Sequence, residues 1–317
     1  MKVLSLFDGL SCGRIALERA GVEVESYYAS EIDKYASTIS KKNWPDIIPI
    51  GDVTQVSYKD GVLHTQFGSY ETDIDMVIGG SPCQSFSVAG NQEGFDGKSG
   101  LFYEWVRILR EVNPKYFLLE NVCMKKEWEN EITQEVGVAP IMINSALVSA
   151  QNRKRLYWTN IEGITQPKDK GILLKDVLQE NVGAAFFYSE KAISYLDRSK
   201  INKRFANYSD SKKSCCLVAN FCKSLPYNVY VDKEKSYCLT ANYANMACVN
   251  YNRGQGQIVF DNKSIRKLTP VECERLQTLP DNYTESVSNS QRYKMIGNGW
   301  TVDVIAHIFS FIKGREQ

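Results

Sequence analysis

The sequence predicts an α/β protein built on a doubly wound, mostly parallel sheet, with a second, smaller domain. Up to about residue 160, short apolar runs suited to buried strands alternate with segments of helical spacing, a pattern typical of parallel sheets. Residues 165–265 differ, because they are polar and rich in Lys, Asn and Tyr. Helical patterns return in "TPVECERLQ" (269–277) and "WTVDVIAHIFSFI" (300–312), which indicates that the chain re-enters the first domain.

Each expected element follows from a short stretch of sequence. Apolar runs predict strands, in chain order, at 2–7, 26–30, 74–79 and 115–120. Helical spacing predicts helices at 13–20, 34–42 and 101–112. A later strand over "SAQNRKRLYW" would carry Gln151, Arg153 and Arg155 at alternate positions, and therefore on one face.

Composition disfavours several classes of protein. The nine cysteines include no CxxC pair and there are only two histidines, so we expect neither a zinc site nor a disulfide framework, and no metal. The start "MKVLSLFDG" is too short an apolar run for a signal peptide, and no run of about 18 apolar residues occurs, so we expect a cytoplasmic protein without membrane contact. Seven basic residues stand against three acidic ones between 189 and 213, which suits a polyanion or a plain solvated surface.

Candidate ligand-binding residues follow three of the predicted strands, where doubly wound sheets bind their ligands. The segment "LFDGLSCG" follows the first strand and lacks the GxGxxG pattern, which disfavours a dinucleotide. Glu31 ends the second strand and can accept the two hydroxyls of a ribose, and Asp52 can accept from an adenine amino group. Either carboxylate alone could be a solvated surface group. Because the three segments come at the ends of strands in chain order, together they favour a nucleoside ligand.

The stretch "GGSPCQSFS" (79–87) places Cys83 after a proline, at the end of a predicted strand and ahead of a glycine-rich loop. A nucleophile under a mobile lid is one interpretation, and a buried inert thiol is the other. Glu120, in "LLENV", could serve as an acid, and Arg153 and Arg155 could grip a polar heterocycle. Each of these could equally be an ordinary strand-end charge.

Together these segments resemble those of the DNA cytosine-5 methyltransferases. "GGSPCQSFS" is similar to the nucleophile segment of that family, "ENV" to its acid segment and "QNRKR" to its paired-arginine segment. "IRKLTPVECERLQTLPDNY" resembles the stretch after its target-recognition region, and "GNGWTVDV" its closing cofactor segment. The resemblance covers nearly the whole chain except roughly 165–260, the variable region of the family. "LFDGLSCG" and the closing segment look more like the animal de novo branch, although a bacterial or phage enzyme is expected.

The resemblance implies a Rossmann-like methyltransferase that moves a methyl group from S-adenosylmethionine to carbon 5 of a flipped-out cytosine in duplex DNA, with S-adenosylhomocysteine as product. Cys83 would add to carbon 6, Glu120 would hold or protonate ring nitrogen 3, and Arg153 and Arg155 would contact the cytosine and its backbone. The residues implied to bind the cofactor are Phe7, Asp8, Gly9, Leu10, Glu31, Ile32, Asp52, Val53, Pro82, Leu101, Asn298 and Trp300. The residues expected to contact DNA are Gln84, Ser85, Ser87, Gln151, Lys200, Lys203, Arg204 and Thr240.

The resemblance also implies a domain organisation. Residues 1–165 would form the catalytic and cofactor-binding domain, 166–287 the target-recognition domain, and 288–317 a segment that returns to the first. Two positions depart from the family pattern: Gly299, which is often serine, and Cys238, where many relatives have threonine. We expect a monomer that acts on DNA in a bacterial or phage-infected cell, as restriction-modification methyltransferases do.

Two other functions are compatible with parts of the sequence. A transfer-RNA cytosine-5 methyltransferase has the same core and shares the cysteine and "ENV" segments, but its characteristic Cys-Phe-Thr tripeptide is absent here. A catalytically silent DNA-binding homologue should have lost the cysteine or the glutamate, and this chain keeps both Cys83 and Glu120.

Overall fold

The computed structural model describes residues 1–82, 100–187 and 264–312, together with four short strands between 219 and 261. The chain divides into two compact units. The first comprises Met1–Ile143, Lys154–Gln166 and Val304–Gln317, and the second comprises Asn144–Arg153 and Pro167–Asp303. The domain boundaries proposed from the sequence, at 165 and 287, stay a prediction.

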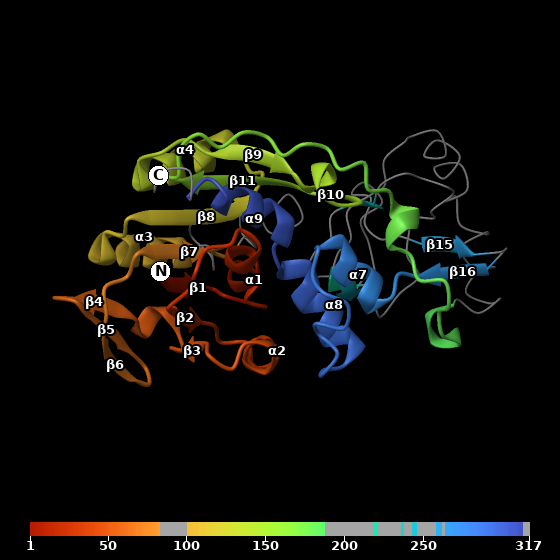
Figure 1. Cartoon of the computed structure of the whole chain (residues 1–317), viewed down its shortest axis with the longest axis horizontal. Helices are drawn as coiled ribbons and strands as arrows, with labels where there is room; N and C mark the ends of the chain where they lie inside the picture. Colours follow the sequence, from red (N-terminus) through yellow and green to blue (C-terminus); the bar gives the residue numbers. More distant parts are fainter. Residues whose placement is uncertain are drawn as a thin grey trace. The chain divides into compact units, whose positions relative to one another are not determined.

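The first unit is organised by a seven-stranded sheet in the order β3-β2-β1-β7-β8-β11-β9 (Figure 1). Its strands are β1 (Lys2–Leu6), β2 (Ser26–Ser30), β3 (Ile48–Pro49), β7 (Met76–Gly79), β8 (Tyr116–Val122), β9 (Ile141–Asn144) and β11 (Lys154–Thr159). The strands from β3 to β8 pair in parallel, and β11 pairs with β8 in the antiparallel sense. The predicted fold class, a doubly wound and mostly parallel sheet, is confirmed.

Three helices of this unit lie within about a residue of the positions that their spacing predicts, one lies within the helical pattern at 300–312, and the one at 126–136 was not predicted. They are α1 (Cys12–Arg19), α2 (Lys34–Asn43), α3 (Leu101–Val112), α4 (Lys126–Val136) and α9 (Val302–Phe309). The apolar face of α3 carries Phe102 and Trp105 into a core that also contains Leu4 and Val77 of the strands. Because β1 and β7 are buried nearly throughout, their sequences read as continuous apolar runs rather than alternating ones.

The backbone packs closely where β7 ends. A Cβ atom on Gly79 would lie 2.6 Å from the carbonyl oxygen of Leu6 and 2.8 Å from Nε1 of Trp105, so this approach of β7 to β1 and α3 requires glycine. The strand order reverses between β1 and β7, since β2 and β3 lie on one side and β8 on the other. Ligands of open α/β sheets bind at such a switch point, outside the carboxyl ends of the strands.

Beside the main sheet lies an antiparallel ribbon that the sequence pattern did not predict. It consists of β4 (Ser57–Lys59), β5 (Val62–Thr65) and β6 (Gly68–Glu71), and it follows the 3-10 helix η1 (Val53–Gln55) (Figure 1). The three strands are three or four residues long and largely exposed, so no apolar run marks them.

The described part of the second unit contains the helices α7 (Pro270–Leu276) and α8 (Asn289–Asn298). Its other elements are the strands β10 (Gln151–Asn152), β12 (Ala219–Asn220), β13 (Ser236–Tyr237), β14 (Tyr243–Asn245), β15 (Ile258–Asp261) and β16 (Ser264–Lys267), and the 3-10 helices η4 (Ser145–Leu147), η5 (Leu174–Val177) and η6 (Ala184–Phe186). The predicted helix at 269–277 is α7, and it begins with a capping box between Thr269 and Glu272.

The predicted single strand over "SAQNRKRLYW" is wrong. β10 pairs with β13, β11 joins the seven-stranded sheet, and Arg153 lies between the two strands. The cause is local, since the backbone N–H of Arg153 donates to Oδ1 of Asn144 at 3.0 Å instead of taking part in a continuous ladder. Gln151, Arg153 and Arg155 therefore do not share one strand face.

Candidate active site

The loop after β1 has an unusual backbone conformation. Phe7, Gly9 and Ser11 have φ angles of 58°, 60° and 54°, in the left-handed region that glycine adopts without strain and other residues rarely occupy. No atom lies within 4 Å of where a Cβ of Gly9 would stand, so that side of the loop is open. Backbone strain of this kind clusters at functional sites, which makes this loop a candidate binding element.

Glu31 closes the loop against the end of β2. Its Oε2 accepts from the backbone N–H of Gly9 at 2.8 Å, and its Oε1 accepts from those of Ile32 and Asp33 at 2.8 and 2.7 Å. Burial raises the pKa of Glu31, and these backbone hydrogen bonds oppose the rise. Since a carboxylate has about four acceptor positions, these three bonds leave about one for a ligand, which suits a ribose hydroxyl.

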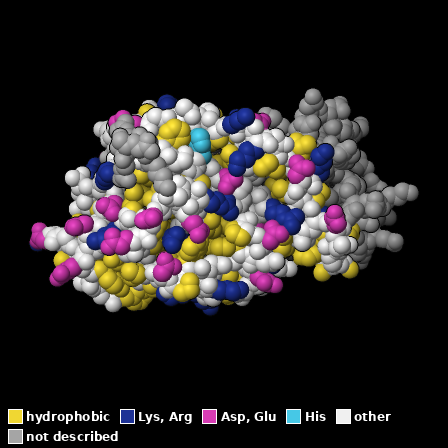
Figure 2. Space-filling view, viewed as in Figure 1, with side chains coloured by type: hydrophobic (Ala, Val, Ile, Leu, Met, Phe, Trp, Pro, Cys, Tyr) yellow, Lys and Arg dark blue, Asp and Glu magenta, His cyan; other side chains and the backbone are white. Residues whose placement is uncertain are grey.

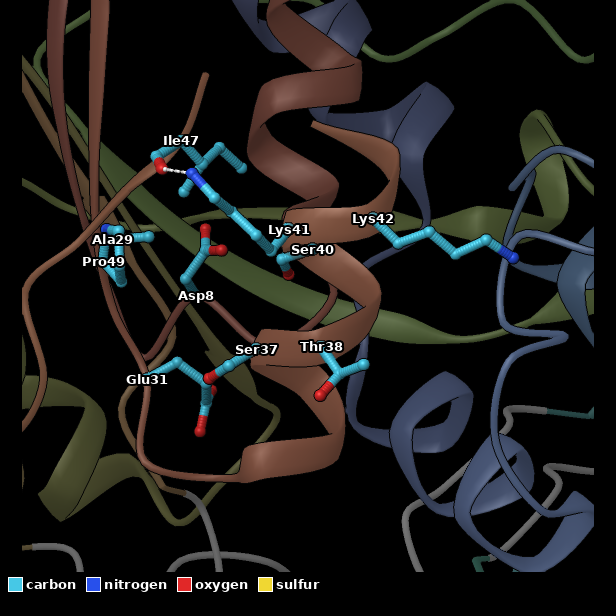
Figure 3. A pocket seen from close by; sticks show the side chains of 10 residues that line it. All are labelled: Asp8, Ala29, Glu31, Ser37, Thr38, Ser40, Lys41, Lys42, Ile47 and Pro49. Atoms are coloured by element: carbon cyan, nitrogen blue, oxygen red, sulfur yellow. Dashed lines mark hydrogen bonds between the residues drawn. The ribbon is translucent and has the colours of Figure 1, made fainter. Parts of the chain in front are cut away.

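A pocket of about 570 Å³ lies beside these groups, within the range of about 300–1,000 Å³ typical of small-molecule sites. Asp8 and Glu31 both line it, as Figure 3 shows. Its remaining lining residues are Ala29, Ser37, Thr38, Ser40, Lys41, Lys42, Ile47 and Pro49. The structure thus brings together two residues that the sequence places after successive strands.

The charged groups that line the pocket are mixed, since the ammonium groups of Lys41 and Lys42 stand beside the carboxylates of Asp8 and Glu31. Two carboxylates face the pocket, and the side chain of Ile32, next to Glu31 in the chain, is 76% exposed. An exposed aliphatic side chain at that position is suited to contact with a flat base. Asp52, after β3, accepts from the backbone N–H of Thr54 at 2.9 Å and caps η1. Val53 is buried in the core, so only its backbone can reach a ligand.

The other residues predicted to bind the cofactor are spread over both units. Leu10 is buried, Leu101 is the first residue of α3, and Pro82 is the last described residue before the gap at 83–99. Asn298 ends α8 in the second unit, where its side chain is exposed, and Trp300 follows it.

Glu120 and Arg155 form an ion pair in the first unit. Nε of Arg155 lies 3.0 Å from Oε1 of Glu120, and both side chains are nearly buried. Glu120 stands opposite Tyr157 in the β8–β11 pair, so Arg155 is its diagonal neighbour on the same face of the sheet. The arginine therefore holds the carboxylate in one position.

The neighbouring Asn121 ties the end of β8 to the segment that leads to Cys83. Its Nδ2 donates to the hydroxyl of Ser81 at 3.2 Å and to the carbonyl of Ser81 at 3.4 Å, and both residues are buried. In the parallel pairing of β7 with β8, Gly79 is aligned with Leu119, which places Glu120 at the level of Gly80. The "ENV" segment is thus bonded to a residue two positions before Cys83 in the chain.

Gln151 and Arg153 have partners inside the second unit. Gln151 is 0% exposed, and its Nε2 donates to the carbonyl of Leu276 at 3.0 Å and to Oε1 of Gln277 at 3.1 Å. The guanidinium of Arg153 donates to the carbonyls of Gly297 and Gly299, at 3.3 and 3.0 Å. Both side chains therefore support the backbone around α7 and α8, and their contacts with DNA or cytosine stay a prediction.

Several predicted residues lie outside the described residues. They are Cys83, Gln84, Ser85, Ser87, Lys200, Lys203, Arg204 and Thr240.

The sequence analysis missed the polar face of α2. Ser37 and Lys41 are four residues apart, as are Thr38 and Lys42, so both pairs recur at helical spacing and all four line the pocket. That spacing marks a polar helix face, but it does not distinguish residues that line a pocket from residues that face solvent.

The described ranges contain no cluster of three or more His, Cys, Asp or Glu side chains placed to hold a metal ion. Of the helices in the described part of the chain, none has both the length and the apolar character to cross a membrane. None of the three cysteines in that part, Cys12, Cys123 and Cys273, is in a disulfide.

Comparison with solved structures establishes the class of fold. The methyltransferase EhMeth of Entamoeba histolytica superposes with a TM-score of 0.72 at 18% identity, over 98% of this chain and 97% of that chain. Together with the sheet order, this places the chain among proteins with the Rossmann-like fold of S-adenosylmethionine-dependent methyltransferases.

Sequence comparison identifies the family. The C-5 cytosine-specific DNA methylase family matches residues 1–314, and the chain belongs to that family. The type II methyltransferase M1.ScrFI of Lactococcus lactis subsp. cremoris is 30% identical, over 96% of this chain and 76% of the relative. The orphan methyltransferase M.SPRI of Bacillus phage SPR is 27% identical, over 98% of this chain and 96% of the relative. The predicted family and enzyme class, a DNA (cytosine-5-)-methyltransferase, are confirmed, and such an enzyme uses a methyl donor.

Proposed function

We propose that this enzyme methylates carbon 5 of a flipped-out cytosine in duplex DNA through a covalent adduct of Cys83, with S-adenosylmethionine as the methyl donor. The observation that carries the proposal is the pair of hydrogen bonds from Asn121 to Ser81. These bonds tie the strand that carries Glu120, β8, to the segment that continues into Cys83. A carboxyl group and a thiol on these two segments can act on the same ring.

The proposed reaction needs both groups because carbon 5 of cytosine is too weak a nucleophile by itself. The thiolate of Cys83 forms a bond to carbon 6, and Glu120 holds or protonates nitrogen 3, so the electron pair of the 5,6 double bond becomes available at carbon 5. S-adenosylmethionine, when bound, supplies an electrophilic methyl group to carbon 5. A base then removes the proton from carbon 5, and Cys83 leaves as the 5,6 double bond re-forms.

The target base must leave the duplex for this chemistry. A stacked and paired cytosine exposes neither its carbon 6 to a thiol nor its nitrogen 3 to a carboxyl group, so the base is rotated out at a cost of a few kcal/mol. Arg155 forms an ion pair with Glu120, so its guanidinium is placed to contact the flipped cytosine beside that carboxylate. Since the relatives come from a bacterium and from a bacterial phage, the cytoplasm of a bacterial or phage-infected cell is the proposed location.

The purified protein is expected to transfer labelled methyl groups from S-adenosylmethionine to duplex DNA and not to transfer RNA. The reason is the family match over nearly the whole chain and the DNA-modifying relatives at 27–30% identity. Bisulfite sequencing of a plasmid expressed with the protein would locate the modified cytosines. Label in transfer RNA alone would establish the second candidate function, and label in neither nucleic acid would indicate a silent homologue.

We propose that the segment 166–287 recognises the target sequence and that its basic residues bind the phosphates of the DNA backbone. Alanine at Lys200, Lys203 or Arg204 should weaken binding about equally on all DNA sequences and flatten its salt dependence, because phosphate contacts position a protein without reading bases. Binding titrations at several salt concentrations would measure both effects. Exchanging the whole segment for that of a relative should change which cytosine is methylated. A folded, active chimera that keeps the parent's target site would place recognition elsewhere.

A further inference from the structure

Asp8 is surrounded by three hydroxyl donors in the first unit. Its Oδ1 accepts from the hydroxyls of Ser5 and Tyr27, both at 2.7 Å, and its Oδ2 accepts from the hydroxyl of Ser11. The donors come from three elements, since Ser5 lies in β1, Ser11 precedes α1 and Tyr27 lies in β2. One carboxylate therefore joins the neighbouring strands β1 and β2 to the loop between β1 and α1.

The three donors are rigidly placed. Ser5, Ser11 and Tyr27 are 2%, 0% and 1% exposed, so none of them can turn toward solvent. Burial and the neighbouring Asp8 charge raise the pKa of Tyr27 well above its usual value, so its phenol stays protonated and donates. The backbone N–H of Ser11 also donates to the carbonyl of Asp8 at 3.1 Å, which ties the left-handed loop to the same residue.

Asp8 also faces the pocket. Figure 3 shows it between Ala29 and Pro49 on one side and Ser40 and Lys41 on the other. Of the charged groups around this pocket, Lys41 of α2 donates to the carbonyls of Pro45 and Ile47, at 2.6 and 3.0 Å. The side chain of Lys42 extends away from Asp8 (Figure 3).

The electrostatic surroundings of Asp8 come from three elements, β2, α1 and α2. Glu31 at the end of β2 and Tyr27 within it act on one side, and Cys12 of α1 lies beside Tyr27. Lys41 and Lys42 of α2 line the same pocket. With about four acceptor positions and three hydroxyl bonds, Asp8 keeps about one position for a donor from the pocket.

We propose that Ser5, Ser11 and Tyr27 are positioning residues that hold the Asp8 carboxylate as a fixed negative charge for the cationic cofactor. The inference rests on the proposed function, because it takes S-adenosylmethionine as the occupant. That cofactor carries a positive sulfonium and an ammonium group. A carboxylate that is already held in place attracts either group without a free-energy cost of reorienting its side chain. Asp8 thereby acts through its side chain, in addition to the backbone of its loop.

The hydrogen bonds from the three hydroxyls also affect the pKa of Asp8. Burial raises the pKa of Asp8, and the bonds from Ser11, Ser5 and Tyr27 lower it. Loss of one donor therefore raises this pKa further. Since protonated Asp8 no longer attracts a cation, the fall in cofactor affinity on acidification should begin at a higher pH when a donor is missing.

The test is Tyr27→Phe, which removes one oxygen atom and leaves the buried ring. Calorimetric binding of S-adenosylmethionine and S-adenosylhomocysteine would be measured from about pH 5 to about pH 9, together with KM, kcat and thermal unfolding. We expect about fivefold to tenfold weaker cofactor binding below neutral pH, a fall in affinity that starts at higher pH, and little change in kcat. Asp8→Asn should weaken binding at least about tenfold and remove the pH dependence.

The matched control is Tyr58→Phe, because the Tyr58 hydroxyl donates at 3.0 Å to the carbonyl of Thr72, away from Asp8. A Tyr27→Phe protein with lower thermal stability but unchanged affinity at every pH would overturn the proposal and leave the network a purely structural one. If the parent protein bound no S-adenosylmethionine, the cofactor assignment would fail, and this proposal with it. Equal losses for both ligands would assign Asp8 to the ammonium group, and a larger loss for S-adenosylmethionine would assign it to the sulfonium; either pattern supports the role.

Discussion

Replacement of Cys83 by serine is expected to abolish methyl transfer while the protein still binds S-adenosylmethionine. A serine hydroxyl is a far weaker nucleophile at neutral pH than a thiolate, so addition to carbon 6 stops, and turnover should fall by about 10⁴-fold or more. Turnover would be measured with labelled cofactor on duplex DNA. Calorimetry of the same sample would show whether cofactor binding is close to that of the parent.

A trapping experiment makes the assignment specific to one thiol. Duplex DNA that contains 5-fluorocytosine cannot lose its carbon 5 substituent, so the parent should form a stable covalent complex and Cys83→Ser should form none. The matched control is Cys123→Ser, because Cys123 is an exposed cysteine only three residues after Glu120. It should keep full activity and full trapping. A complex formed through any cysteine other than Cys83 would remove Cys83 from the mechanism.

Glu120→Gln is expected to lower kcat by about 10²–10⁴-fold with a much smaller change in the KM for DNA, the usual effect of losing a general acid or base. The amide has nearly the same shape as the carboxyl group but carries no charge and cannot exchange a proton with nitrogen 3. The ion pair with Arg155, at 3.0 Å, is weakened at the same time to a hydrogen bond between a guanidinium and a neutral amide. Steady-state kinetics on duplex DNA would measure kcat and KM.

A matched control in the same unit measures the effect of losing an ion pair away from the proposed active site. Glu104→Gln breaks the pair with Arg107 on α3, at 2.7 Å, at a site where both side chains are about one-third exposed. Such partly exposed pairs contribute roughly 0–1 kcal/mol, so this variant should keep the parent's kcat. If Glu120→Gln and Glu104→Gln had equal kcat values, Glu120 would have no role beyond its ion pair.

The strands and helices around the sheet were predictable because they depend on local properties. A parallel strand covered on both faces must be apolar along its whole length, so β1, β2, β7 and β8 are legible as short apolar runs. Helical spacing located α3 at 101–112 to the residue, since Phe102, Trp105, Val106 and Ile108 all face one core. The ribbon β4–β6 escaped prediction because its strands are three or four residues long and only one of their side chains, Leu63, is buried, so they leave no periodic signal.

The position of candidate ligand residues was also predictable, because the carboxyl ends of parallel strands meet at one edge. Asp8 and Glu31 follow the successive strands β1 and β2, and they line one pocket. The α2 residues of that pocket were missed although their helical spacing is visible. Nothing in the sequence pattern sets polar residues that line a pocket apart from polar residues that face solvent.

Only the tertiary structure decided which side chains bond to one another across long sequence separations. The side chain of Asn144 accepts from the backbone N–H of Arg153, and this bond interrupts the segment "SAQNRKRLYW", whose alternating pattern predicts one strand. Gln151 donates to Leu276, more than one hundred residues away, and so becomes buried. Tyr27 donates to Asp8 across two paired strands. Alternation and apolar runs indicate which stretch of chain is buried and whether it forms a strand or a helix, because both properties extend over several neighbouring residues. The hydrogen-bond partner of a single buried polar group depends instead on how distant parts of the chain pack together.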